Sequence, residues 1–365
     1  MAAETFALLA ERYPQHPLSR PASLWLIQYY ASGEAAWREQ MRLYPDALPS
    51  TFGTGVGDEG VDPTLSQRER ELDKFEDRLN RAAALGKQIE RTNPELFAEP
   101  ALRFPLAAAW RNQSSPRLAE QFYQVQSRSA GRDEWAACAA GETWLADPKG
   151  KQPKPTQRCR QAANKPKLDG RLDDEIWQTV ESSPLKSALN DDEQWPAVVA
   201  FTYDAEFLYI AVSCRRAPGV KYEPTAEPRP RDADLTAQDR VDVFIDIDRD
   251  FATYYRLSFD YRGFTADSCW GDATWNPTWF VAAQLTDETW TIEAAIALDQ
   301  LSAWNRHIAG VAENNTGKMP LPHAKSREIW AVGVQRTIPG VGFQSWSTPA
   351  STLVAPEGFG YLIFE

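Results

Sequence analysis

KPKLDGRLDDEIWQ, residues 165–178, opens the part of the chain that decides the fold. Before this stretch, apolar residues recur at helical spacing. After it, short segments with alternating apolar and polar residues follow one another down to PEGFGYLIFE at 356–365. Many short alternating strands with little helix between them indicate a sandwich or a barrel. We therefore expect an antiparallel β-sandwich over residues 165–365.

A hairpin is the simplest structure for the first two strands. VVAFTY at 198–203 and FLYIAVS at 207–213 are separated by Asp204-Ala205-Glu206, a short polar connection.

The strand expected over residues 240–248 has a polar side. Alternation over 240–248 places Val241 and Val243 on one face, and Asp242, Phe244 and Asp246 on the other.

The first part of the chain reads as packed helices. Spacing near 3.6 residues predicts helices over 4–13, 22–31, 34–44, 70–92, 116–128 and 132–146. Tyr13-Pro14 and Tyr44-Pro45 lie 31 residues apart, each after a predicted helix, which favours a repeated helix hairpin. This spacing and WAACAAGETWL at 135–145 resemble degenerate tetratricopeptide repeats. An irregular helical bundle is the alternative.

A linker is expected between the two parts. Residues 148–164 are rich in Pro, Lys and Arg and contain almost no apolar side chain. The predicted organisation is therefore a helical region at 1–147, a linker at 148–164 and a β-sandwich at 165–365.

Charge and hydropathy exclude two classes of partner. The net charge of −12 and the pI near 5.0 argue against nucleic acid, which is bound by clustered Lys and Arg. No run approaches the roughly 18 apolar residues that span a bilayer, and the first residues lack the features of a signal peptide. Because the chain begins within an amphipathic helix pattern, we expect it to be an excerpt of a longer polypeptide.

The four cysteines are widely spaced. Cys138, Cys159, Cys214 and Cys269 form no CxxC pair, which argues against zinc or thioredoxin-like chemistry. Buried thiols are favoured over disulfides.

An ordered set of motifs in the second part resembles a family 9 carbohydrate-binding module, over about residues 165–365. The motifs are LDGRLDDEIWQ, FLYIAVSC, DRVDVFIDID, YYRLSFDYRG, WTIEAAIALDQL, IWAVGVQR and PEGFGYLIF. The resemblance implies a noncatalytic β-sandwich that binds polysaccharides or oligosaccharides, sometimes with bound calcium, attached to a secreted or surface protein. An extracytoplasmic or cell-surface location follows from it.

The resemblance also implies a binding site. Its polar ligand positions fall on Asp242, Ser258 and Asp260, and Arg256 and Glu293 could share their surface. Carboxylates and a guanidinium suit bidentate hydrogen bonds to sugar hydroxyls. A solvated face with cross-strand ion pairs is the alternative.

Flat aromatic rings are the second requirement for sugar binding, because a pyranose presents C–H groups that stack on an aromatic face. Four tryptophans lie in polar segments where a large ring has less reason to be buried. They are Trp270, Trp275, Trp279 and Trp346. Rings that pack over the ends of the sandwich are the alternative.

Calcium is a possible cofactor. Asp246, Asp248 and Asp250 in IDIDRD offer oxygen ligands, although Phe251 stands where an EF-hand has glycine. An aspartate-rich hairpin is the other interpretation.

Two further functional classes stay open. Related sandwiches bind haem, and Lys318, Met319 and His323 lie together in KMPLPH. The second class is a structural assembly component with a protein partner on the helical region. The three histidines occur in no recognisable nucleophile motif, so we expect no enzymatic activity.

Overall fold

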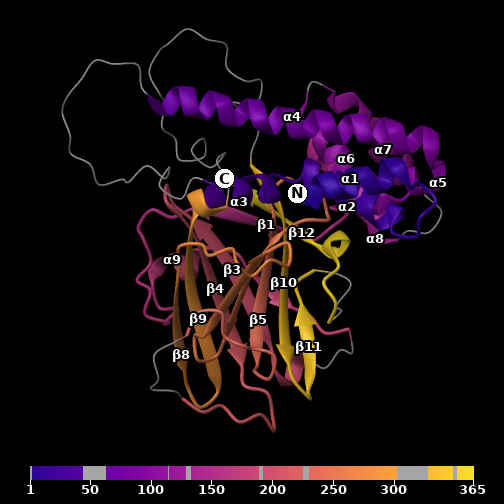
Figure 1. Ribbon diagram of the computed structural model, residues 1–365. Helices are drawn as coiled ribbons and strands as arrows, with labels where there is room; N and C mark the ends of the chain where they lie inside the picture. Colours follow the sequence, from indigo (N-terminus) through magenta and orange to yellow (C-terminus); the bar gives the residue numbers. More distant parts are fainter. Residues whose placement is uncertain are drawn as a thin grey trace. The chain divides into compact units, whose positions relative to one another are not determined.

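The computed structural model describes residues 2–43, 63–113, 115–128, 133–188, 192–224, 230–301, 328–347 and 352–365. The side chains of residues 40–76 lie outside this description. The chain forms two compact units, Met1–Val125 and Gln126–Glu365. Each is treated by itself below, with the labels of Figure 1.

The N-terminal unit is helical. Helices α2, α4 and α6 pack on one another through apolar side chains that include Ile27, Ile89 and Leu106. The helices are α1 (Ala2–Arg12), α2 (Ser19–Ala31), α3 (Gly33–Leu43), α4 (Pro63–Thr92), α5 (Pro94–Phe97), α6 (Pro100–Asn112) and α7 (Pro116–Gln126).

The sequence analysis did not predict helices α5 and α6. Helix α6 is buried at Leu102 and then continuously from Phe104 to Ala109, so it shows no amphipathic period. Pro105 within it also reads as a helix breaker. Burial on nearly all sides therefore removed the signal on which the prediction depended.

The tetratricopeptide resemblance stays a prediction. Helix α1 ends at Arg12, just before Tyr13-Pro14, whereas Tyr44-Pro45 lies outside the described residues. A 34-residue repeat contains two helices, but α4 alone spans 30 residues. The described helices fit an irregular bundle better than a regular array.

The C-terminal unit is the expected β-sandwich, with twelve strands among the described residues (Figure 1). They are β1 (Thr156–Gln161), β2 (Ser182–Leu185), β3 (Ala197–Tyr203), β4 (Phe207–Arg215), β5 (Arg240–Asp246), β6 (Tyr255–Asp260), β7 (Thr265–Cys269), β8 (Trp279–Leu285), β9 (Thr289–Ala297), β10 (Ile329–Ile338), β11 (Gly342–Ser345) and β12 (Gly360–Phe364).

The strands form two sheets joined by one strand. The first sheet has the order β7-β6-β5-β10-β12, with β11 paired to β10. The second has the order β3-β4-β9-β8, with β2 paired to β3. Strand β1 pairs in parallel with both β12 and β3, and every other pairing between strands is antiparallel. The predicted hairpin of β3 and β4 is confirmed.

The core lies between the sheets. Val241, Val243 and Ile245 of β5 face it, as the alternation predicted, and Ile292 and Ile296 of β9 belong to the same apolar cluster. The four cysteines are buried and free, which agrees with the prediction of buried thiols.

The expected linker at 148–164 is not a linker. Residues Thr156–Gln161 form β1, and Cys159 on this strand is fully buried. The polar composition of TQRCRQ gave no indication of a strand. A strand paired on both edges gains its backbone hydrogen bonds whatever its side chains are.

Helix α8 (Glu134–Ala146) belongs to the C-terminal unit rather than to a helical region ending at 147. Its Glu142 accepts a hydrogen bond from Nε of Arg249 at 3.0 Å, and the thiol of Cys138 donates to the carbonyl of Glu357 at 3.0 Å. The boundary between the units therefore precedes α8.

The opening motif, residues 165–178, is hydrogen-bonded to Glu293 on β9 of the second sheet. The backbone amides of Asp169 and Gly170 donate to Oε2 of Glu293 at 3.0 and 2.8 Å, and Nε1 of Trp177 donates to Oε1 at 2.7 Å. Burial raises the pKa of Glu293, and these hydrogen bonds oppose the rise. The suggestion that Glu293 joins the polar side of β5 and β6 is wrong, because it lies on β9 beneath the motif.

No helix in the described ranges is both long enough and apolar enough to cross a membrane.

Candidate functional site

The outward side of β5 and β6 carries a polar cluster. The antiparallel register sets Asp242 opposite Ser258, and Phe244 opposite Arg256. On the other side of β5, Gln335 of β10 lies opposite Asp242, and Ser345 of β11 lies opposite Gln335. The sequence prediction of one shared surface is correct for Asp242, Arg256 and Ser258.

Asp242 is the centre of this cluster and is only 2% exposed. Its Oδ1 accepts hydrogen bonds from Nε and Nη2 of Arg256 at 3.1 and 2.8 Å and from the hydroxyl of Ser258 at 2.5 Å. Its Oδ2 accepts from Nε of Arg240 at 3.2 Å. The carboxylate is thus occupied by protein donors, and its effect is to fix two guanidinium groups.

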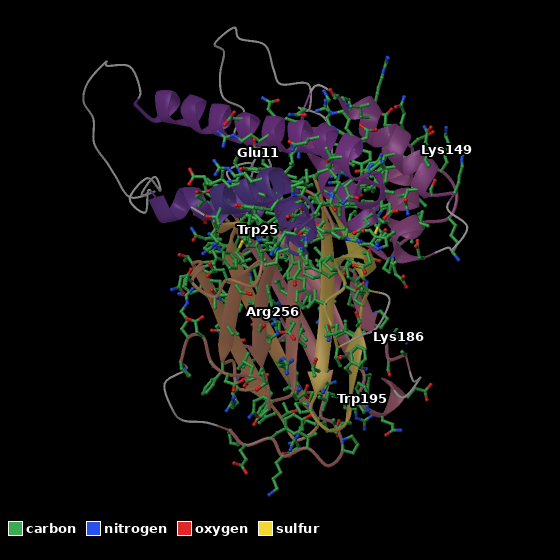
Figure 2. The ribbon with its side chains drawn as sticks, turned by 45° about the vertical axis from the view of Figure 1, so that its right-hand side comes forward. Glu11, Trp25, Lys149, Lys186, Trp195 and Arg256 are labelled. Carbon is green, nitrogen blue, oxygen red and sulfur yellow. The ribbon has the colours of Figure 1, made fainter. Side chains whose placement is uncertain are left out.

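Arg256 is the accessible member of the cluster. Its side chain is 38% exposed, and its guanidinium lies 5.9 Å from the ring centre of Phe244. Nη1 makes no hydrogen bond to a described residue, since the contacts to Asp242 use Nε and Nη2. Figure 2 labels this residue on the strands of the C-terminal unit. A charged donor held at a fixed position can bind an acceptor from solution.

A shallow depression adjoins the cluster, and its volume is about 10 Å³, room for about one water molecule. Phe244 and Phe359 stack in its wall with ring centres 5.7 Å apart. A Cβ atom on Gly333 would come within 2.6 Å of Phe359, so this glycine permits the packing. The lining residues are Phe244, Val334, Gln335, Ser345, Ser347, Leu353, Val354, Ala355 and Phe359.

Similarity to known proteins agrees with this fold. Residues 168–318 match the family model described as carbohydrate family 9 binding domain-like. These residues form a carbohydrate family 9 binding-like domain. Curated proteins gave no significant match.

Solved structures similar to this chain include two complexes of one kind of module. Both are family 9 carbohydrate-binding modules from Caldicellulosiruptor kristjanssonii, one in complex with cellotriose and one with glucose. The first is 18% identical with a TM-score of 0.40, and the match covers 58% of this chain and 94% of the module. The second is 18% identical with a TM-score of 0.37, covering 57% and 96%.

Asp260 of the family 9-like domain does not join the polar cluster. Its Oδ2 accepts from Nε and Nη2 of Arg262 at 2.9 and 2.6 Å. Its Oδ1 accepts from the backbone amides of Arg262 and Phe264 at 2.9 and 3.2 Å. The side chain is fully buried. Asp260 therefore shapes the turn between β6 and β7, contrary to the sequence-based expectation.

The expected aromatic platforms are largely covered. Trp346 is 9% exposed and belongs to the core, and Trp275 is 3% exposed and stacks on Tyr255 with ring centres 4.5 Å apart. Trp270 and Trp279 are partly buried against the same core. The polar composition of their loop misled the prediction, because the ends of a sandwich also need apolar cover.

Asp246 at the end of β5 and the aspartates just after it shape a turn in the family 9-like domain. Asp246 accepts from the backbone amides of Asp250 and Phe251 at 3.2 and 2.8 Å. Asp250 accepts from the amides of Ala252 and Thr253, both at 2.7 Å. Burial and the adjacent charge of Asp248 raise the pKa of Asp250 to about 8.

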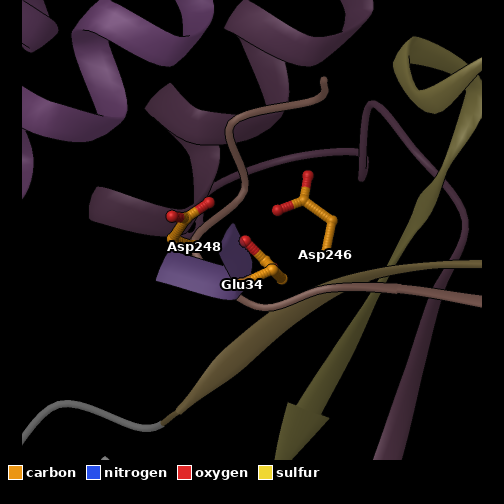
Figure 3. A group of neighbouring side chains, drawn as sticks. All are labelled: Glu34, Asp246 and Asp248. Atoms are coloured by element: carbon orange, nitrogen blue, oxygen red, sulfur yellow. The ribbon is translucent and has the colours of Figure 1, made fainter. Parts of the chain in front are cut away.

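Figure 3 draws Asp246 and Asp248 of this turn. Glu34, the third side chain in that figure, belongs to the N-terminal unit. The haem alternative depends on Lys318, Met319 and His323, which lie outside the described residues.

Sequence reasoning missed Arg240, Gln335 and the part of the depression that includes Leu353. Arg240 comes two residues before Asp242 on the same side of β5, and that spacing could have indicated it. Gln335 and Leu353 gave no signal, because pairing between distant strands is invisible in one sequence.

Proposed function

We propose that the C-terminal unit binds a saccharide without catalysis, through the surface formed by Asp242, Arg256, Ser258, Gln335 and the adjoining depression. The family-model match over residues 168–318 carries the proposal. The position of an accessible, fixed guanidinium beside a depression supports it.

The chemistry of the surface is rich in donors. Arg256 and Gln335 offer N–H groups, and the depression adds the hydroxyls of Ser345 and Ser347. Sugar hydroxyls accept and donate hydrogen bonds, so such a surface can hold one or a few sugar rings. The depression of about 10 Å³ is far smaller than the roughly 300–1,000 Å³ of pockets that enclose a ligand, so a sugar would lie on this face rather than inside it.

Binding rather than catalysis is supported by the state of the carboxylates. Asp242, Asp246 and Asp260 all accept hydrogen bonds from protein donors, as given above. Glycoside hydrolysis needs a pair of carboxyl groups that can donate and accept protons or attack the sugar. Carboxylates held in this way are poorly suited to that work.

The affinity is expected to be modest. A sugar clamped between exposed tryptophan rings gains stacking energy, but Trp275 and Trp346 are buried here. We expect dissociation constants from about micromolar to millimolar, or roughly 4 to 8 kcal/mol. The helical unit would act as a scaffold, and an extracytoplasmic or cell-surface location fits a polysaccharide ligand.

Calcium at the turn of Asp246, Asp248 and Asp250 is a separate proposal. Each carboxylate oxygen has two lone pairs, so an oxygen that accepts an amide can still bind a cation. The raised pKa of Asp250 reflects burial and repulsion, and a cation would remove the repulsion. A melting temperature that is the same in calcium and in a chelator would contradict calcium binding.

A glycan array followed by calorimetry tests saccharide binding. Glucose, cellotriose, xylan oligomers and uronate-containing oligomers are the first probes. The expected result is saturable binding that a change at Arg256 weakens. Absence of binding across the array would refute the proposal. An absorption spectrum of the purified protein tests the haem alternative, since a haem protein is coloured.

A further inference from the structure

Arg103 in the helical unit lies among aromatic rings from three helices. Its guanidinium carbon is 4.5 Å from the ring centre of Phe97 on α5 and 4.6 Å from that of Phe122 on α7. It is 5.9 Å from the ring of Trp110 on α6. These contacts hold the side chain by cation–π attraction.

The rings leave the hydrogen-bonding capacity of Arg103 unused. Its guanidinium forms no hydrogen bond or ion pair with any residue that the structure describes, and its buried Nε has no partner there. Burial lowers the pKa of Arg103, and the charge of Glu90 opposes this. Since a guanidinium stays protonated, it is a cation partly removed from water. The cation–π contacts involve the charge of the guanidinium, whereas its N–H donors lie in the guanidinium plane. The aromatic rings therefore leave these donors without an acceptor.

Helix α7, which contacts Arg103 through Phe122, carries exposed apolar side chains. Leu118, Phe122 and Val125 follow the helical spacing i, i+4, i+7 on α7, and Leu118 and Val125 are 43% and 74% exposed. Glu90, whose charge acts on Arg103, and Glu95 and Glu99 precede α6 in the chain. Within residues 100–126, however, Arg103, Arg111 and Arg117 stand against the single acid Glu120, which leaves helices α6 and α7 with a net positive charge. This charge is opposite to that of the whole chain, which is −12.

We propose that Arg103 anchors a carboxylate on an acidic, partly apolar segment of a partner protein. The planar fork of arginine matches a carboxylate through two parallel hydrogen bonds. The stripe of Leu118, Phe122 and Val125 would contact apolar side chains next to that carboxylate. This site lies wholly within the N-terminal unit and does not depend on saccharide binding.

Fluorescence anisotropy with the full chain tests the site. The probe is a fluorescein-labelled peptide, Ser-Leu-Glu-Leu-Glu-Leu-Ser, compared with the same peptide carrying Gln in place of Glu. The variants are Arg103→Gln and Arg103→Lys, with Arg117→Gln as a matched control, because Arg117 is an exposed arginine of α7. We expect binding of the Glu peptide to weaken at least tenfold in Arg103→Gln, severalfold in Arg103→Lys, and less than twofold in the control.

Leu118→Asp keeps the proposal testable if Arg103→Gln fails to fold. The exposed position should tolerate the change, and the new charge should repel the peptide and weaken binding at least tenfold. Equal binding of the Glu and Gln peptides, or unchanged binding in Leu118→Asp, would overturn the proposal. So would oligogalacturonate that binds in an Arg103-dependent manner while the peptide does not, since the ligand would then be an acidic glycan.

Discussion

Arg336 and Asp239 form an ion pair whose side chains have no exposure to solvent. Nε and Nη2 of Arg336 donate to Oδ1 and Oδ2 of Asp239 at 2.9 and 2.6 Å. Arg336 on β10 also donates to the carbonyl of Arg215 on β4, and Nε1 of Trp290 on β9 donates to Asp239. The pair therefore joins the two sheets of the sandwich.

Replacing one partner of this pair should destabilise the protein strongly. Arg336→Met leaves the Asp239 charge buried without its cation, which should cost about 3–5 kcal/mol. The double variant Asp239→Leu with Arg336→Met should recover most of that loss. Denaturant unfolding measures both effects. Lys149→Ala, which breaks an exposed pair with Asp147, is the control and should cost about 1 kcal/mol or less. An equal cost in Arg336→Met and the control would contradict the prediction.

Arg256→Gln should weaken saccharide binding in a protein that still folds, with some loss of stability because the buried Asp242 carboxylate loses the two hydrogen bonds from Arg256. A hydrogen bond to a charged group contributes about 1.5–3 kcal/mol, so the affinity should fall about tenfold or more. Calorimetry with the tightest saccharide from the array gives the dissociation constant, and a thermal melt checks folding. Arg171→Gln is the control, since Arg171 is an exposed arginine of the opening motif. Unchanged affinity in Arg256→Gln would move the site away from this face.

Trp346→Ala should lower stability rather than act through a lost stacking platform. Trp346 packs in the core, and a Cβ atom on Gly360 would lie 3.0 Å from its ring. Removing a buried aromatic side chain costs about 3–5 kcal/mol. Phe280→Ala is the comparison, because that ring is 51% exposed and its loss should cost about 0.5 kcal/mol or less. A stable Trp346→Ala protein with lost affinity would restore the platform interpretation.

The contrast between Asp242 and Trp346 shows what the sequence could predict. Alternation along β5 assigned Asp242 to the outward side, because a period of two follows from strand geometry. It could not reveal that Arg240, Arg256 and Ser258 would saturate that carboxylate, since hydrogen-bond partners depend on register. The burial of Trp346 depends on β12, which approaches from the end of the chain. The period of two predicted the face of β5 on which Asp242 lies. The pairing of strands far apart in the sequence decided which groups cover Asp242 and Trp346.

Asp267 should make stability depend on pH. Its side chain is fully buried on β7 and accepts from Nε1 of Trp279 at 3.0 Å. Burial raises its pKa from 3.8 to about 6. Between these two values the folded state binds more protons than the unfolded state, so this group's contribution to stability falls as pH rises through that window.

Melting temperatures of the wild type and Asp267→Asn, measured from pH 3.5 to 7.5, test this effect. Asparagine keeps an acceptor for Trp279 but cannot ionise. The wild type should lose stability relative to the variant as pH rises from about 4 to about 6, and the difference should be constant above that window. A difference that is constant across the whole range would show that Asp267 does not titrate there.

Gly170→Ala should destabilise the opening motif by more than backbone strain alone. Gly170 has φ of +82°, and an added Cβ atom would lie 2.6 Å from the carbonyl carbon of Ala283 on β8. Gly150 has a similar φ of +76°, but its Cβ would meet nothing within 4 Å. Gly150→Ala is therefore a matched control that carries only the left-handed backbone cost, about 1–2 kcal/mol.

The collision should add to that cost in Gly170→Ala, because backbone atoms of β8 cannot move aside as a flexible side chain would. Shifting the loop instead would pull the amides of Asp169 and Gly170 away from Glu293 and leave a buried carboxylate with fewer donors. Denaturant unfolding should place Gly170→Ala well below Gly150→Ala in stability. Equal stability of the two variants would mean that the loop at Gly170 can move away from β8 without a loss of stability. The hydrogen bonds from Asp169 and Gly170 to Glu293 would then not stabilise the second sheet.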